Sequence, residues 1–440
     1  MPNDRKQKLR PRERDSIIQS LRAGVTPRAG IQHIQVGRIH EVEALLKDIE
    51  RIADGGSAFR LIIGAFGSGK SFFLQLIRSI ALEKGLVTVH ADLSPDRRIH
   101  STGGQARNLY AELMRNLSTR TKPDGNAVVS VVERFITESR KKADNTGQST
   151  EEVIESRLRS LTELVGGYDF AKVVAAYWRG YEQDNDQLKS DAIRWLRGEF
   201  STKTDARKAL DVRSIVDDAS FYDYLKLMSL FVRQAGYKGL IVNLDELVNL
   251  YKLSSQKARI SNYEQILRIL NDCLQGSAEY LGFLLGGTPE FLFDSRKGLY
   301  CYEALQSRLA ENSFAINAGV RDYTAPTLHL DNLAPEELYI LLQNLRHVYA
   351  SGDESNYLVP DEALESFLIH CSKQIGDAYF KTPRNTIKAF IDFLVTLDQS
   401  DNLKWGNLVS EVKVSLEHDS DMPTIDTDDN IDDELTTFKL

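Results

Sequence analysis

Residues 64–71 form a glycine-rich stretch that ends in a lysine and a serine, in the order G-x-x-x-x-G-K-S. Glycines at this spacing let the backbone curl, so that several N–H groups converge on the oxygens of a phosphate chain. Lys70 can reach the outer phosphates and Ser71 can hold Mg²⁺. An apolar run precedes the stretch and a helix-like run follows it, which is the context that this Walker A pattern requires. We therefore predict that ATP contacts Gly64, Ala65, Phe66, Gly67, Ser68, Gly69, Lys70, Ser71 and Phe72.

A second stretch, Gly239–Glu246, is an apolar run that ends in two adjacent acids, Asp245 and Glu246. Such a pair is common by itself, but after a Walker A loop it forms the Walker B pattern. In that role Asp245 organises the Mg²⁺ shell and Glu246 polarises the attacking water as a general base. Together the two stretches predict hydrolysis of ATP and not binding alone.

The separation of the two stretches is unusually long, because 173 residues lie between Ser71 and Asp245. A connection of one helix, one strand and another helix needs far fewer. Residues 121–211 carry apolar stripes of helical period among many acids and bases of nearly equal number. This balance is typical of helices with a solvated face over a modest core. We predict a helical insertion at about 121–211.

Strands and helices in alternation must position these residues. Apolar, β-branched and aromatic runs predict strands at 59–63, 86–92, 239–246, 281–290 and 327–330. Helical periodicity predicts helices at 16–21, 42–49, 72–80, 109–117, 262–273 and 302–309. This alternation predicts an α/β fold of the P-loop NTPase type, with a parallel sheet sandwiched by helices.

Thr288 lies near the carboxyl end of the predicted strand at 281–290. Ligands of open parallel sheets bind beyond these strand ends, so the Thr288 hydroxyl is a candidate sensor of the γ-phosphate or of the attacking water. The alternative is a threonine that shapes the turn before Pro289. The sequence leaves both interpretations open.

The ends of the chain differ from its centre. Residues 1–14 are rich in arginine and lysine, and we interpret them as a solvated basic tail in preference to a nucleic-acid-binding arm. Residues 15–332 form the predicted nucleotide-binding domain. Residues 333–416 are predicted to be helical, and residues 417–440 form an acidic tail of low hydrophobicity that we expect to be disordered.

The composition excludes several classes of protein. The formal net charge is −8, and the acidic tail alone carries that charge, so the body is neither a strongly basic DNA binder nor an acidic mimic. Cys273, Cys301 and Cys371 are few and far apart, which indicates reduced thiols in a cytoplasmic protein and no zinc site. No apolar run approaches the roughly 18 residues of a membrane helix, and no signal peptide is visible.

The segment Val36-Gly37-Arg38, followed by Glu41, a short helix and the P-loop strand, resembles the N-terminal linker of AAA+ and STAND ATPases. The resemblance implies that Val36, Gly37 and Arg38 lie beside the adenine base. The alternative is an ordinary loop before a helix. The helices of residues 333–416 likewise resemble the small helical lid of AAA+ proteins.

The resemblance to AAA+ proteins also implies roles for two arginines. Arg384 follows Thr382 and a proline at the start of the last long helix, where AAA+ lids carry the arginine called sensor 2. Arg308 occupies a position from which many AAA+ proteins reach the nucleotide of a neighbouring subunit. The alternative for each is a surface ion pair, which for Arg308 would involve Glu303 or Glu311.

Taken together, several segments resemble one family, the ATP-binding proteins of bacterial BREX-type phage-defence operons (BrxD-like ATPases). The resemblance covers roughly residues 15–400 and excludes the acidic tail. It implies an AAA+-type ATPase that works with a helicase-like partner against phage. The segments that carry it are Leu21–Arg38, the P-loop, the stretch around Trp195, Gly236–Glu246 and Thr382–Arg384.

The leading hypothesis is a cytoplasmic, Mg²⁺-dependent ATPase that acts as a motor or switch. Two alternatives stay open: a nucleotide-gated binding module with little turnover, and a DNA-loading ATPase of the initiator or clamp-loader type. A kinase is disfavoured because no acceptor pocket is recognisable. A homo-oligomer and a direct or indirect contact with DNA are compatible with the sequence, and a membrane partner is not expected.

Overall fold

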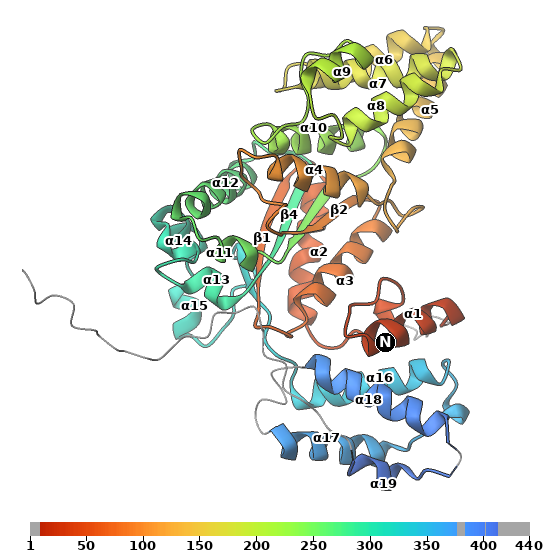
Figure 1. Ribbon diagram of the computed structural model, residues 1–440, viewed down its shortest axis with the longest axis vertical. Helices are drawn as coiled ribbons and strands as arrows, with labels where there is room; N and C mark the ends of the chain where they lie inside the picture. Colours follow the sequence, from red (N-terminus) through yellow and green to blue (C-terminus); the bar gives the residue numbers. More distant parts are fainter. Residues whose placement is uncertain (1–8, 376–382, 401, 412–440) are drawn as a thin grey trace, which may run out of the picture.

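A computed structural model describes residues 9–375, 383–400 and 402–411 of the protein (Figure 1). Its centre is a five-stranded parallel β-sheet with the strand order β2-β3-β4-β1-β5. All carboxyl ends of a parallel sheet lie at the same edge, so the residues that follow the strands meet there. The strands are β1 (Ser57–Ile63), β2 (Val87–Asp92), β3 (Leu240–Asp245), β4 (Leu281–Gly287) and β5 (Thr327–His329).

The pairing of the strands places the carboxyl ends of β1 and β3, which lead into the predicted site residues, at the same edge of the sheet. β4 lies between β1 and β3, so a single strand separates the loop after β1 from the acids at the end of β3. Asp92, the last residue of β2, pairs with Asp245, the last residue of β3. Ile63 at the end of β1 pairs with Gly287 at the end of β4. The Walker A loop and the two Walker B acids therefore follow the same edge of the sheet.

Helices cover both faces of the sheet because its strands are apolar on both sides. Along β1, Phe59 and Leu61 enter one core, whereas Ala58 and Ile62 enter the other. The helices on the Ile62 face are α2 (Ile39–Ala53) and α3 (Lys70–Glu83). The helices on the Phe59 face are α4 (Gln105–Arg115), α10 (Phe221–Gln234) and α12 (Gln256–Gln275). Short helices follow β3 and β4: α11 (Val248–Tyr251), α13 (Pro289–Phe293), α14 (Glu303–Leu309) and α15 (Ser313–Asn317).

Five helices between β2 and β3 form what we call the helical region, residues 128–210. In Figure 1 they stack beyond α4 and α10, at the end of the molecule far from the C-terminal helices. Trp195 is 1% exposed there, and it packs edge-on against Phe170 and Tyr224. The apolar core of this region is continuous with the Phe59 face of the sheet. Its helices are α5 (Val128–Thr146), α6 (Thr150–Leu158), α7 (Gly167–Glu182), α8 (Asp186–Leu196) and α9 (Lys203–Leu210).

The C-terminal bundle has a core of its own. It consists of α16 (Pro335–Tyr349), α17 (Asp361–Ile375), α18 (Pro383–Asp398) and α19 (Trp405–Val409). The N-terminal helix α1 (Pro11–Arg22) packs against α18 and α16, and Ile17 and Ile34 are buried in the bundle core (Figure 1).

Polar contacts fasten α1 to the bundle as well. The Nε of Arg14 donates to the carbonyl of Tyr349 over 2.9 Å, and Arg22 forms an ion pair with Asp392 over 2.9 Å. Helix α1 and the C-terminal bundle are therefore one packing unit.

The predicted strands are all present, and the predicted helices overlap observed ones. The helix predicted from Ser16 begins earlier, at Pro11, because a proline at the first helical position needs no N–H partner. Helix α10 was not predicted, although its polar residues Asp223, Lys226 and Arg233 recur at helical spacing. Residues 1–8, Thr382 and the acidic tail lie outside the described residues. Within the described part of the chain, no helix is long and apolar enough to cross a membrane.

Candidate nucleotide site

A cavity of about 1020 Å³ lies at the carboxyl edge of the sheet, between the sheet and the C-terminal bundle. Most residues predicted from the sequence line it, although they come from distant parts of the chain. The predicted residues that line the cavity are Val36, Arg38, Phe66, Gly67, Ser68, Gly69, Lys70, Ser71, Phe72, Asp245, Glu246, Thr288 and Arg384.

The Walker A loop wraps around its own lysine. The Lys70 ammonium group donates to the carbonyl oxygens of Gly64 and Ala65, over 2.8 and 3.0 Å. Gly69 has a φ of 87° and precedes the first residue of α3, so the loop enters the helix through a left-handed conformation that glycine tolerates best. A Cβ atom at Gly64 would lie 2.4 Å from the Oγ of Ser68, which explains the glycine at that position. The loop thus places a cation and the N-terminus of α3 at the cavity.

The Walker A serine and the Walker B aspartate meet directly. The Oγ of Ser71 donates to Oδ2 of Asp245 over 2.6 Å, and the backbone N–H of Glu246 donates to Oδ1 of Asp245 over 2.9 Å. Glu246 has a φ of 58°, a conformation uncommon for a residue with a side chain. The structure therefore brings Ser71, Asp245 and Glu246 together, as the two motifs require.

Thr288 has a structural task that is visible in the fold. Its Oγ1 accepts a hydrogen bond from the backbone N–H of Phe291 over 3.4 Å and so caps α13, which begins at Pro289. The residue is 7% exposed and also lines the cavity. The two interpretations of Thr288 are thus compatible, because the residue that caps α13 also lines the cavity that Asp245 lines.

The Val36–Arg38 segment joins the loop to the bundle. Val36 packs against the bundle core, and the Nη2 of Arg38 donates to the carbonyls of Ser68 and Asp331 over 2.7 and 2.8 Å. Burial lowers the pKa of Arg38 below its ordinary value, and neighbouring carboxylates oppose that shift. Gly37 does not line the cavity, and a Cβ atom there would lie 2.0 Å from Oε1 of Glu337.

The two predicted arginines lie in different places. Arg384, in the first turn of α18, lines the cavity, and its guanidinium group lies close to Gly24. Arg308 lies outside the cavity, where it donates to Oδ1 of Asn271 over 2.8 Å and to the carbonyl of Ala304 over 2.9 Å. Its predicted role concerns a neighbouring subunit and stays a prediction.

The cavity lining that was not predicted as part of the site includes Asp92, Lys252 and the loop Gly24–Thr26. Partial removal from water raises the pKa of the Asp92 carboxyl above its ordinary value, and the nearby charge of Asp245 raises it further. Asp92 was detectable, because it ends an apolar strand in the same way as Asp245. Lys252 and Gly24–Thr26 have no such local signal.

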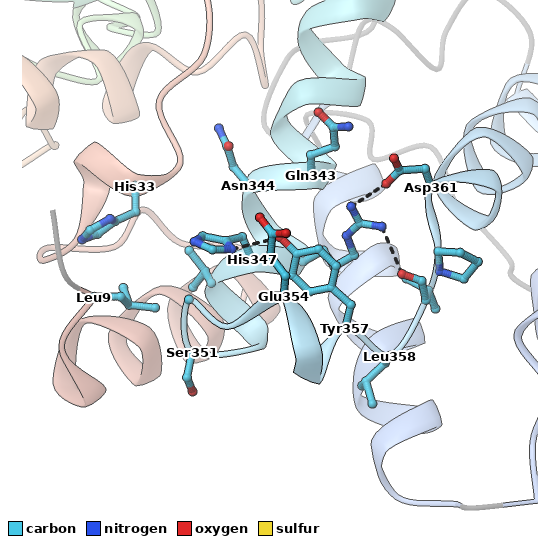
Figure 2. Close-up of a pocket in the computed structure, with 15 residues that line it drawn as sticks. Leu9, His33, Gln343, Asn344, His347, Ser351, Glu354, Tyr357, Leu358 and Asp361 are labelled. Carbon is cyan, nitrogen blue, oxygen red and sulfur yellow. Dashed lines mark hydrogen bonds and ion pairs between the residues drawn. The ribbon is translucent and has the colours of Figure 1, made fainter. Parts of the chain in front are cut away.

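A second cavity, of about 1110 Å³, lies on the C-terminal bundle, where α16 ends and α17 begins (Figure 2). Three contacts hold the Arg346 side chain in place. It donates to the carbonyl of Val359 over 3.0 Å and to the carboxylate of Asp361, and its guanidinium group lies over the Tyr357 ring. The Nδ1 of His347 lies 3.0 Å from the hydroxyl of Tyr357. These contacts tie the loop after α16 to its helix, and none of the predicted site residues lines this cavity.

The residues of the first cavity fit ATP with Mg²⁺. The Ser71–Asp245 pair offers two oxygen ligands of the kind that Mg²⁺ prefers, and Lys70 offers a cation for the phosphates. The Oγ of Ser68 is buried without a hydrogen-bond partner in the loop that would surround the phosphates. An unpaired buried hydroxyl is costly, and a phosphate oxygen is a suitable acceptor for it.

A parallel sheet flanked by helices, with a Walker A loop at its carboxyl edge, is compatible with the class of P-loop NTPases. A comparison with protein families agrees and is more specific. The family described as BREX system ATP-binding protein BrxC/D matches residues 9–413, and the chain belongs to it. The protein is therefore an ATP-binding protein of BREX anti-phage defence, which suggests partners encoded in the same defence operon. No curated protein matches the chain.

Proposed function

We propose that the protein is a Mg²⁺-dependent, AAA+-like ATPase in which hydrolysis changes the position of the C-terminal bundle. The observation that carries the proposal is the meeting of Ser71, Asp245 and Glu246 at one end of a cavity whose other wall is the bundle. A site that contacts two packing units can convert its own occupancy into their relative position.

Each residue then has a defined task. Lys70 and the backbone N–H groups of the Walker A loop bind the phosphates, and Ser71 and Asp245 hold Mg²⁺, which neutralises phosphate charge when bound. Glu246 accepts a proton from the water that attacks the outer phosphorus atom. The bond from that phosphorus to the bridging oxygen breaks, and the products are ADP and phosphate.

The bundle acts in this proposal as the lid of the site, and Arg384 reports on the nucleotide. Arg384 belongs to α18, lines the cavity and lies close to Gly24, so it is the bundle's cation at the site. The apolar part of the cavity, with Val36 and Phe72 packed against the bundle core, is suited to the adenine base. The helical region would be the insertion of an AAA+-like domain.

We further propose that the ATPase works in the cytoplasm with another protein of its defence operon, for example a helicase. Its membership in the BREX family supports a partner of this kind. Arg308 lies on the surface, and this position is compatible with a contact to a second copy of the chain. Contact with DNA, direct or through the partner, belongs to the same proposal.

The test is the substitution Glu246→Gln. We expect it to keep ATP binding and to lower the turnover number at least about 100-fold, because a general base contributes about 10²–10⁴-fold. Glu264→Gln, an exposed position on α12, is the matched control and should keep full turnover. Equal turnover in the wild type and in Glu246→Gln would contradict the assignment. Binding without turnover in the wild type, with or without DNA, would favour a nucleotide-gated switch.

A further inference from the structure

Lys252 is a cavity-lining cation whose position is set by the segment that follows the Walker B acids. Helix α11 (Val248–Tyr251) begins two residues after Glu246. Lys252 follows its last residue, and the backbone N–H of Lys252 donates to the carbonyl of Val248 over 3.0 Å. Lys252 lines the same cavity as Asp245 and Glu246. A short helix thus brings Lys252 to the same cavity that the end of β3 lines.

Contacts to three neighbouring elements hold α11 in place. The side-chain amide of Asn249 donates to the carbonyl of Leu93, just after β2, over 2.8 Å. The hydroxyl of Tyr251 donates to Asp294, at the end of α13, over 2.8 Å. The backbone N–H of Leu247 donates to the carbonyl of Gly286 in β4 over 3.1 Å. The backbone that carries Lys252 is therefore fixed by the same strand ends that form the site.

The other cavity-lining cations of the described residues have different positions or tasks. Lys70 lies within the Walker A loop, and Arg38 is bonded to the carbonyls of Ser68 and Asp331. Arg384 comes from the bundle and lies close to Gly24. Lys252 thus adds a fourth cation to this cavity, from the segment that follows β3 and Glu246.

Hydrolysis of a triphosphate needs positive charge where the outer phosphoryl group leaves. That group carries negative charge over three oxygens in the transition state, and a fixed cation in a water-poor site stabilises it strongly. In some nucleotide hydrolases an arginine from the same chain or from a second protein supplies this charge. Lys252 is a group that this chain could use for that purpose without a partner.

We propose that Lys252 is a catalytic residue that donates N–H hydrogen bonds to the outer phosphoryl group of ATP. The inference rests on the proposed ATPase function and adds a residue to its site. As the attacking water forms its bond to phosphorus, Glu246 takes the proton, and the bond to the ADP oxygen breaks. Lys252 keeps its own proton throughout and stabilises the phosphoryl oxygens.

The substitutions Lys252→Met and Lys252→Arg in the full-length protein test the proposal, with Lys257→Met as the matched control. Lys257 is exposed at the start of α12, five residues further along the chain. We expect Lys252→Met to lower kcat by about 100-fold or more, with a much smaller change in KM. Lys252→Arg should retain part of the activity, and Lys257→Met should match the wild type.

A binding measurement separates catalysis from a merely structural role. Lys252→Met should weaken binding of ADP with aluminium fluoride, which mimics the transferred phosphoryl group, by at least about tenfold, and leave ADP binding unchanged. Wild-type kcat in Lys252→Met would overturn the role of Lys252 and leave the ATPase proposal intact. Equal loss of ADP and ADP–aluminium fluoride binding would also overturn it.

If the wild type binds ATP without turnover, the ATPase proposal fails, and the ratio of ATP to ADP affinity still tests Lys252. A lower ratio in Lys252→Met supports its contact with the outer phosphate. An unchanged ratio contradicts that contact. If Lys252→Met does not fold, the same ratio measured in Lys252→Arg and in Lys252→Gln decides in the same way.

Discussion

Two helical parts of the molecule, the helical region and the C-terminal bundle, are attached to the sheet in different ways. The core of the helical region is continuous with the Phe59 face of the sheet, and Trp195 and Phe59 belong to one apolar cluster. The bundle has a separate core, which includes Phe390 and also Ile17 of α1. The cavity in which we propose that ATP binds lies between this second unit and the sheet.

This difference between the helical region and the bundle indicates which of them can change its position when a ligand binds. A shared, close-packed core couples the helical region to the sheet, because displacement of one would open cavities in the other. Because the bundle has its own core, our proposal is that it shifts against the sheet with that core intact, and a ligand in the cavity would contact both units. We therefore expect the bundle to be the moving part and the helical region to be an extension of the sheet.

The largest expected effect is that of Trp195→Ala. Removal of this buried ring, with its hydrogen bond from Nε1 to the carbonyl of Ser214, should destabilise the sheet and the helical region together by about 3–5 kcal/mol. Denaturant unfolding, monitored by hydrogen exchange, should show that the sheet and the helical region open in one step. Tyr168→Ala, which is 66% exposed in the same region, is the control and should change stability by less than about 0.5 kcal/mol. Unfolding of the helical region with the sheet still protected would contradict the shared core.

The matching experiment in the bundle is Phe390→Ala. Its ring is fully buried and lies 5.2 Å from the Phe367 ring, measured between centroids, so its loss should cost about 3 kcal/mol. Because the bundle has its own core, the loss should appear as faster hydrogen exchange in α1, α16 and α18. Amides of β1, β3 and β4 should keep their protection. Equal loss of protection in the sheet would show that the two units are a single core.

A smaller effect, confined to the sheet side, should come from His90 on β2. Burial, together with the charges of Arg78 and Arg28, lowers the pKa of His90 to about 4. The unfolded chain binds a proton near pH 6.5 and the folded chain near pH 4, so stability is lost as pH falls through this window. The loss should reach about 2–3 kcal/mol at pH 4. His90→Asn should lose correspondingly less between pH 7 and pH 4 in urea titrations, and an identical pH dependence of both proteins would exclude this role.

Much of the fold was predictable, because its signals are local. Each strand is an apolar run, and the strands at 240–245 and 87–92 each end in an acid that marks the carboxyl edge. The packing of α1 on the bundle was not predictable, since it joins Arg14 to Tyr349 across most of the chain. Helix α10 was detectable by the same local signals, because Asp223, Lys226 and Arg233 recur at helical spacing between its apolar residues.

The residues of the candidate site divide in the same way, into those with a local sequence signal and those that tertiary packing brings to the cavity. Seven of the nine residues predicted around the Walker A loop line the cavity together with Asp245 and Glu246, because a loop and a strand end carry their own geometry, whereas Gly64 and Ala65 do not line it. Gly37 and Arg308 were predicted from resemblance, and both lie outside the cavity. Lys252 and the Gly24–Thr26 loop reach the cavity through tertiary packing, which no spacing in the sequence reveals.

The most direct test of the central claim is the affinity for ATP with Mg²⁺, measured by calorimetry on the full chain and on Lys70→Ala. Lys84→Ala, an exposed lysine at the other end of α3, is the matched control. We expect one saturable site in the wild type and in Lys84→Ala, and an affinity at least about 30-fold weaker in Lys70→Ala, because a charged partner of the phosphates is lost. Equal affinity of the wild type and a folded Lys70→Ala would contradict the placement of ATP in this cavity.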